Sequence, residues 1–196
     1  ALGEVKAEKA GEALCYAMFV DDETGRNLFR DAQLSMIQIG NQDIIDNLIS
    51  CYDLKNAKAN ELAQSIKLKP EWIQIKAVNV MGQMRDERLL PKMLEEFDKG
   101  MNDKIVYELY AKIIQAIGIA ASPSAEPVLS KSFLVTPRGT EYLNEKEIIS
   151  NTLIDIGQSE HIDEFMKIAE KGDITLKNAY GKPEAFAQYC MAAANV

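Results

Sequence analysis

The repeating pattern of this chain is clearest in residues 75–97, which read IKAVNVMGQMRDERLLPKMLEEF. Apolar side chains at helical spacing lead up to Gly82, a polar and mainly charged turn follows, and a second apolar series begins at Pro91. This pattern predicts two amphipathic helices joined by a tight turn.

The same pattern recurs when Gly40, Gly118 and Gly157 are aligned on Gly82, with neighbouring glycines roughly 40 residues apart. The positions one, four, five and eight residues before each glycine trace one face of an α-helix. They carry apolar or compact side chains, and Gln74 is the main break in the stripe. In chain order they are Ala32, Ser35, Met36 and Ile39; Gln74, Ala77, Val78 and Met81; Tyr110, Ile113, Ile114 and Ile117; Ile149, Thr152, Leu153 and Ile156.

Each aligned glycine directly follows the last apolar position of its stripe. We therefore expect it to end the first helix in a left-handed conformation, which glycine adopts without a steric penalty. Polar residues that can cap the next helix come after it: Asn41 or Asp43, Asp86, Ser122 or Ser124, and Ser159. The second helices align on Asp46, Pro91, Pro127 and Asp163, and proline is tolerated in a first helical turn.

A two-helix unit of this size cannot bury its apolar face alone, so several copies must share one core. The pattern Ala-Val-x-x-Met-Gly, a charged turn, then Leu-Leu-Pro-x-x-Leu resembles HEAT repeats, in particular the shorter HEAT-like repeats also found in phycobilisome lyase-type proteins. The resemblance covers residues 23–171 and, more weakly, both ends. It implies an all-α fold, an α-solenoid of about four full helix pairs with half-repeats at both ends.

These boundaries predict a single elongated domain over residues 1–196. We expect half-repeats at residues 1–22 and, after a connector, within 172–196. The full repeats are residues 23–54, 70–100, 101–135 and 147–171, with an insertion at 55–69 that holds a short extra helix and a loop at 136–146.

Positive charge concentrates in and beside the insertion, and two interpretations stay open. The lysines form either a solvated edge or a docking ridge for an acidic partner. Trp72, the single tryptophan, either packs between repeats or anchors a partner. The lysines are Lys55, Lys58, Lys67, Lys69 and Lys76.

Composition excludes several classes of function. The net charge of −8 and the pI near 4.8 argue against a nucleic-acid partner, because binding there depends on neutralising phosphates. No apolar run is long enough to span a membrane. We expect a cytoplasmic protein, with secretion or the cell envelope left open by a first residue other than Met. Oligomeric state is not predicted.

The cysteines are odd in number and widely spaced. Cys15, Cys51 and Cys190 each lie in an apolar stretch with helical spacing, which favours small buried side chains in reduced form. A bridge between Cys15 and Cys51 stays open from the sequence.

The sequence offers little chemistry for catalysis. His161 is the only histidine, and the chain has neither a Cys-x-x-Cys motif nor a Gly-rich phosphate loop. Carboxylates such as Glu95 and Glu96 are adjacent and so point in different directions on a helix. We therefore expect no metal, no cofactor and no enzymatic activity.

Two functions are compatible with the repeat. In the first, a scaffold binds a protein partner, with a basic segment as the natural ligand of a mainly acidic inner surface. In the second, the resemblance to phycobilisome lyase-type proteins implies an enzyme that attaches a tetrapyrrole to a protein cysteine, although only the repeat itself carries that resemblance. For the scaffold, the candidate partner-binding residues on second helices are Asn47, Ser50, Asp53, Lys92, Glu95, Glu96, Ser130, Glu164 and Lys167, with Arg138 and Tyr142 as candidates in the loop.

Overall fold

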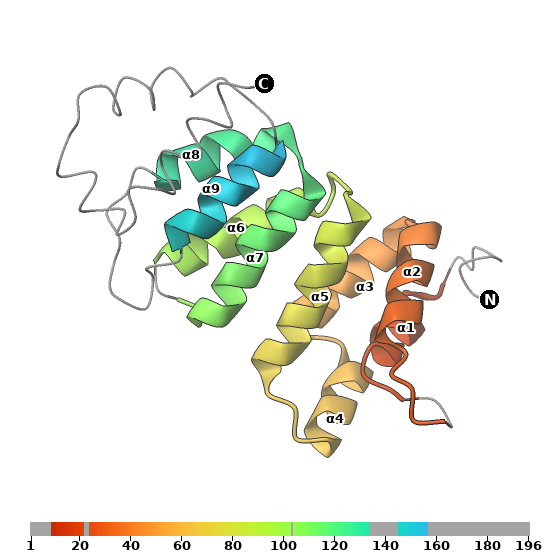
Figure 1. Cartoon of the computed structure of the whole chain (residues 1–196). Helices are drawn as coiled ribbons and strands as arrows, with labels where there is room; N and C mark the ends of the chain where they lie inside the picture. The colour runs from red at the N-terminus through yellow and green to blue at the C-terminus, as the bar shows by residue number, and fades with distance from the viewer. Residues whose placement is uncertain (1–8, 22–23, 103, 134–144, 157–196) are drawn as a thin grey trace, which may run out of the picture. The chain divides into compact units, whose positions relative to one another are not determined.

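The computed structural model describes residues 9–21, 24–102, 104–133 and 145–156. Over these residues the chain forms nine α-helices and one short 3-10 helix. Strand geometry in the same ranges is limited to one isolated bridge, between Asp21 and Asn27. The all-α class predicted from the repeat is therefore confirmed for the described residues (Figure 1).

The chain divides into two compact units, residues 1–93 and 94–196. The first unit holds α1 (Gly11–Ala17), α2 (Phe29–Ile39), α3 (Gln42–Tyr52), α4 (Ala57–Ser65) and α5 (Pro70–Met84). Helix α6 (Leu90–Met101) begins in the first unit and ends in the second. The second unit also holds α7 (Tyr107–Ala120), the 3-10 helix η1 (Pro123–Ala125), α8 (Glu126–Phe133) and α9 (Glu145–Ile156).

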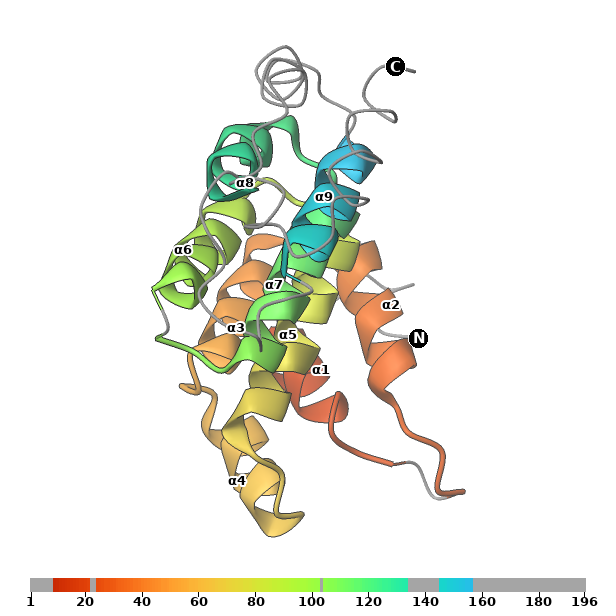
Figure 2. The same cartoon turned by 60° about the vertical axis from the view of Figure 1, so that its left-hand side comes forward.

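In the first unit, α3 lies between α1 and α5, and α2 packs against the same two helices (Figures 1 and 2). The shared core contains Met36 from α2, Ile44 and Leu48 from α3, and Val78 and Met81 from α5. The short helix predicted within the insertion is α4, which packs against α1 and α5 and buries Ala59 and Ala63. In the second unit, α9 packs against both α7 and α8.

The apolar stripe predicted for the first helices is buried. Helices α2, α5, α7 and α9 carry its four copies, and only Ser35, Ile39 and Gln74 are partly exposed. The helices that follow in the chain, α3, α6 and α8, bury Leu48, Met93 and Leu129, each two residues after the aligned positions Asp46, Pro91 and Pro127. Hydrophobic periodicity therefore identified both kinds of helix correctly within the described residues, and the second helix predicted around Asp163 lies outside them.

The glycine alignment was only partly right about helix ends. Gly40 does end α2, with a left-handed φ of 54°. Gly82 and Gly118, however, lie inside α5 and α7, which end at Met84 and Ala120 and are followed by the C-cap residues Arg85 and Ala121, both with a left-handed φ of 51°. Gly157 lies outside the described residues.

Packing explains why Gly118 sits inside a helix. A Cβ built on Gly118 would lie 3.1 Å from the Oγ1 and Cγ2 atoms of Thr152 on α9. The Thr152 hydroxyl donates a hydrogen bond to the Ile114 carbonyl on α7 at 3.3 Å. The glycine thus allows α9 to approach α7 closely, which is a second use of a residue without a side chain.

Several of the predicted caps are present. The Asn41 side chain accepts a hydrogen bond from the Ile44 amide at 3.0 Å and caps α3. Asp86 accepts from the Arg88 amide at 2.9 Å in the turn before α6. Pro91 and Pro127 occupy the first turns of α6 and α8. The Ser122 side chain, by contrast, makes no cap hydrogen bond.

Candidate functional site

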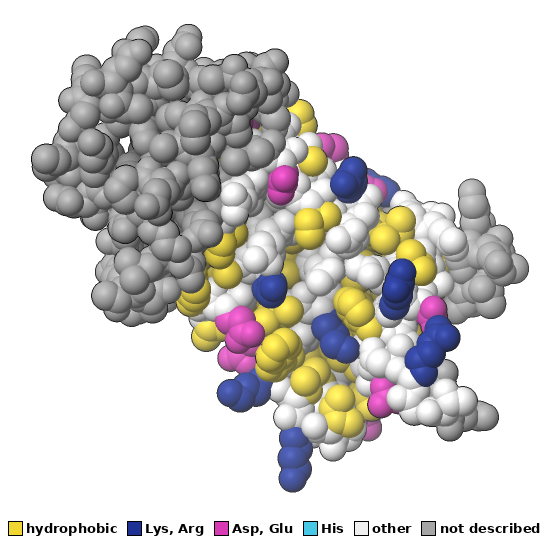
Figure 3. All heavy atoms as spheres, viewed as in Figure 1, with side chains coloured by type: hydrophobic (Ala, Val, Ile, Leu, Met, Phe, Trp, Pro, Cys, Tyr) yellow, Lys and Arg dark blue, Asp and Glu magenta, His cyan; other side chains and the backbone are white. Residues whose placement is uncertain are grey.

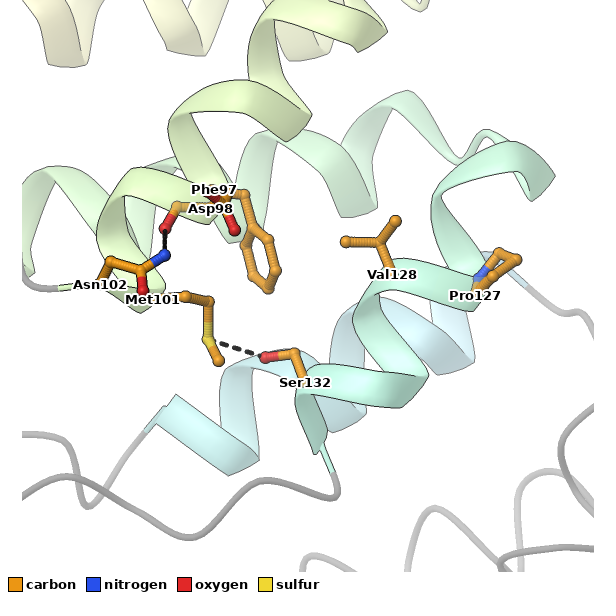
Figure 4. A pocket seen from close by; sticks show the side chains of 7 residues that line it. All are labelled: Phe97, Asp98, Met101, Asn102, Pro127, Val128 and Ser132. Atoms are coloured by element: carbon orange, nitrogen blue, oxygen red, sulfur yellow. Dashed lines mark hydrogen bonds between the residues drawn. The ribbon is translucent and has the colours of Figure 1, made fainter.

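The candidate site is a pocket of about 610 Å³ in the second unit (Figure 4). It lies between the C-terminal turns of α6 and the helix α8, and all its lining residues belong to this unit. Those residues are Phe97, Asp98, Met101 and Asn102 on one side and Pro127, Val128 and Ser132 on the other.

The floor of the pocket is held rigidly by α7. Phe97 is 1% exposed, and its ring packs on the Tyr110 ring with centroids 5.5 Å apart. A Cβ built on Gly100 would lie 2.0 Å from a Tyr110 ring atom, so glycine is what allows α6 to approach this ring. The Phe97 side chain is consequently fixed in place beneath the pocket.

Met101 is fixed from two directions. The Tyr110 hydroxyl donates to its sulfur at 2.9 Å, and the Ser132 hydroxyl on α8 donates to the same atom at 3.0 Å (Figure 4). Thioether sulfur is a weak acceptor, so these contacts orient the side chain more than they stabilise the fold. They join α6, α7 and α8 around the pocket.

The rim combines an apolar and an anionic group. Val128 is 38% exposed and borders the opening, and Asp98 and Asn102 are exposed on the opposite side. Asn102 donates to the Asp98 backbone carbonyl at 2.8 Å, which leaves the Asp98 carboxylate out of that bond. No cation among the described residues forms an ion pair with that carboxylate. The pocket therefore offers an apolar floor beside an exposed negative charge.

The predicted partner-binding carboxylates of α6 are engaged within their own helix. Lys99 pairs with Glu95 at 2.8 Å and with Glu96 at 2.6 Å. Hydrogen bonds to these two carboxylates raise the pKa of Lys99 despite some desolvation. Glu96 is only 4% exposed, so it presents little surface to a partner.

Asp53 and Lys92 form an ion pair in the first unit. The Lys92 ammonium lies 2.7 Å from the Asp53 carboxylate and 5.2 Å from the centre of the Tyr52 ring. Lys55 contacts the same carboxylate at 2.9 Å. Burial alone would raise the pKa of Asp53, but the hydrogen bonds from Lys92 and Lys55 outweigh it, so the pKa lies below its ordinary value. These two predicted residues thus join the end of α3 to the start of α6.

The remaining predicted partner-binding residues lie on α3, on α8 or outside the described residues. Asn47 donates to the Asp43 carbonyl at 2.8 Å and lies against Gly11 of α1. Ser50 is partly buried on α3, and Ser130 is buried on α8, where it donates to Glu126 at 2.6 Å. Arg138, Tyr142, Glu164 and Lys167 lie outside the described residues.

The lysines in and beside the insertion do not share one role. Lys76 is partly buried: its ammonium donates to the Met18 carbonyl at 2.6 Å and lies 5.0 and 5.1 Å from the Phe19 and Phe29 ring centres. Desolvation lowers its pKa. It therefore holds α5 to the segment after α1, and the interpretation of Lys76 as part of an exposed lysine edge is wrong.

The other lysines of this group are exposed, and Lys58 pairs with Glu12 at 2.7 Å. Trp72 is 43% exposed. On the face shown in Figure 3, hydrophobic and basic side chains are interspersed over α4 and α5. A smaller pocket of about 310 Å³ is present in the first unit, lined by Tyr16, Lys58, Glu61, Leu62 and Ser65.

Sequence reasoning did not find the pocket between α6 and α8. Phe97 belongs to the apolar series that begins at Pro91, but the sequence pattern did not indicate Asp98, Met101, Val128 or Ser132 as pocket residues. One usable signal was the position of Val128, an apolar residue beside the stripe of a short helix. Periodicity cannot show whether such a residue is covered by a neighbour.

The described residues contain no group of three or more His, Cys, Asp or Glu side chains that could hold a metal ion. None of the helices in the described ranges has the length and apolar character needed to cross a membrane. Comparison with protein-family models, curated proteins and solved structures found no match for this chain.

Proposed function

We propose that this chain is a non-enzymatic scaffold of HEAT-like repeats that binds a segment of a protein partner in the pocket between α6 and α8. In this proposal α2, α5, α7 and α9 are the first helices of an α-solenoid, and α3, α6 and α8 are second helices. The observation that carries it is the apolar pocket with Asp98 exposed on its rim, where no cation of the described part of the chain pairs with it.

The chemistry of the pocket supports a peptide ligand. Its volume lies within the usual range for ligand sites and accommodates a large aliphatic or aromatic side chain. Burying such a side chain contributes about 1.5–3 kcal/mol. A Lys or Arg beside Asp98 would add at most about 1 kcal/mol at an exposed site but would orient the segment. The expected ligand is therefore a large apolar residue with a basic residue close by.

The same residues argue against catalysis in the pocket. Among its described lining residues the one hydroxyl nucleophile, Ser132, donates its proton to the Met101 sulfur, and none is a histidine, cysteine or lysine. A nucleophile without an adjacent base is not activated. No observation on the described residues favours the lyase alternative.

A peptide-display selection tests the proposal. The full-length protein is the target, and enriched peptides are resynthesised and measured by fluorescence anisotropy. We expect the enriched peptides to share a large apolar residue with Lys or Arg a few positions away. Val128→Glu should weaken their binding at least about tenfold, which is 1.4 kcal/mol. Asp98→Asn should weaken it less and reduce its dependence on salt.

Val106→Glu is the matched control. Val106 is the same residue type, is 48% exposed, lies in the same unit and is outside the pocket. Circular dichroism melts confirm that both variants fold. Equal losses of affinity in Val106→Glu and Val128→Glu would contradict the proposal, as would enriched peptides that lack the apolar and basic pattern.

A further inference from the structure

Helices α1 and α3 pack against each other and run in the same direction, because Gly11 lies beside Asp43 and Asn47 and Cys15 lies beside Cys51. Near the start of α1, the Gly11 amide donates to Asp43 at 2.8 Å, and a Cβ built on Gly11 would lie 2.6 Å from the Asn47 side-chain amide nitrogen. Cys15 lies one turn after Gly11, and Cys51 lies one turn after Asn47. The register of the close contact therefore places the two cysteines opposite each other.

The side chains confirm this pairing. Cys15 and Cys51 are both free thiols, and neither has any exposed surface. The Cys51 thiol is the largest cause of a raised pKa of Cys15, followed by burial. The two sulfur atoms are thus neighbours in the core between α1 and α3.

We propose that Cys15 and Cys51 form a redox site, at which a small disulfide of the glutathione class converts the two thiols into an intramolecular disulfide that fixes α1 to α3. This site is independent of the proposed partner-binding pocket, which lies in the second unit.

The reaction is two successive thiol–disulfide exchanges. One cysteine loses its proton, attacks oxidised glutathione, and forms a mixed disulfide while one glutathione thiolate leaves. The second cysteine then attacks the protein sulfur of that mixed disulfide and displaces the second glutathione. One S–S bond breaks and one forms; the two cysteines lose two protons and two electrons, and two glutathione thiols result.

The structure indicates how oxidised glutathione can reach the two thiols and how the disulfide would affect the fold. Both thiols are covered and burial disfavours the thiolate of Cys15, so the reaction requires α1 to detach briefly from α3. Helix α1 has only seven residues, and a helix that short depends on packing for its stability. A disulfide would hold α1 in place and close a loop that contains the whole of α2.

The test uses the full chain with Cys190→Ser, so that Cys15 and Cys51 are the only thiols. The protein is equilibrated over a series of reduced-to-oxidised glutathione ratios, quenched in acid, unfolded, and alkylated with N-ethylmaleimide. Intact mass then separates the dithiol, the mixed disulfide and the internal disulfide. A non-reducing peptide map identifies the linked peptides.

We expect the internal disulfide to be the main oxidised product. Its equilibrium constant should be at least about tenfold larger in native buffer than in denaturing guanidinium chloride, since a bond favoured by the fold must stabilise the fold by the same factor. The oxidised protein should accordingly melt at a higher temperature than the reduced protein. Low urea concentrations should speed oxidation, because they open α1.

Three results would overturn the inference: only mixed disulfides or linked dimers form, the equilibrium constant is the same in native and denaturing conditions, or the bridged protein melts at a lower temperature than the reduced one. The control for the exchange reaction is Cys51→Ala in the Cys190→Ser background. It should give only the glutathione adduct of Cys15, with no rise in melting temperature after oxidation.

Discussion

At the residue scale, glycines set how closely helices approach in the second unit. Gly118 allows α9 to reach α7, and Gly100 allows α6 to reach the Tyr110 ring. Neither has a positive φ, so both serve packing and not a turn. The Gly100 contact is the tighter of the two, and it also supports the floor of the pocket.

Gly100→Ala is expected to destabilise the protein. The new Cβ would lie 2.0 Å from one Tyr110 ring atom and 2.6 Å from the Cγ atom, and the ring is fully buried. The overpacking should cost about 1–3 kcal/mol in excess of the roughly 1 kcal/mol that alanine gains over glycine in a helix. Urea denaturation measures the change in the free energy of unfolding.

A Tyr110→Leu background is the control for this prediction. With the ring removed, Gly100→Ala should cost much less or become favourable, because contacting residues couple in a double-mutant cycle. An equal loss in both backgrounds would show that the Tyr110 contact is not the cause.

At the element scale, the helices are held by local caps and by ion pairs between elements. Asn41 begins α3, Asn56 begins α4 through a hydrogen bond to the Ala59 amide, and the Asp53–Lys92 pair connects α3 to α6. Caps satisfy amides that have no partner within the helix. Ion pairs, in contrast, make stability depend on pH.

Asn41→Ala should lower the free energy of unfolding by about 1 kcal/mol, because the Ile44 amide loses its acceptor. Asn41→Asp is the conservative variant: it keeps an acceptor and adds a negative charge at the positive end of the α3 dipole, so its stability should be at or above that of the wild type. Thermal melts followed by circular dichroism distinguish these results. A loss of the same size in both variants would contradict the capping role.

Asp53→Asn should lower stability by about 1–2 kcal/mol near neutral pH, between the values for exposed and buried ion pairs. The folded protein holds the pKa of Asp53 below its ordinary value of 3.8, so the folded state binds fewer protons than the unfolded state in this range. The stabilisation is therefore fully present above pH 3.8 and is lost as the pH falls through the lower folded value. Denaturation curves across this range measure the difference between variant and wild type.

The difference in stability between Asp53→Asn and the wild type should shrink in acid. Asp31→Asn, which removes an exposed pair with Arg26, is the matched control and should change stability little at any pH. A difference between Asp53→Asn and wild type that is independent of pH would contradict the ion-pair explanation.

At the scale of the whole molecule, two features bear on partners: the negative net charge and the division into two compact units. The net charge is that of the full sequence, and it repels a polyanion overall. The pocket, in contrast, belongs to the second unit alone.

We expect no measurable binding to duplex DNA at about 0.15 M salt. With a net charge of −8 the chain has no general electrostatic attraction to phosphates, so the dissociation constant should be weaker than about 10⁻⁴ M. Anisotropy of a fluorescent duplex titrated with the protein gives this value. Saturable binding at lower concentrations would indicate a basic surface that the net charge conceals.

The sequence by itself determined the class of fold and most of the helices. The stripes around Met36, Val78 and Ile114 follow from local periodicity, which depends only on residues within a few turns of one another. The start of α5 at Pro70 and the cap at Asn41 are equally local, because a first turn is set by its own side chains.

Only the tertiary structure decided the ends of α5 and α7, the pocket and the pairing of cysteines. Arg85 and Ala121 take the left-handed positions that the sequence pattern assigned to Gly82 and Gly118. Whether Val128 borders an opening, and whether Cys15 meets Cys51, depends on the distance and register between helices far apart in the chain. The distance and register between two helices depend on the side-chain volumes at their interface, and the periodicity of a single helix does not reveal them.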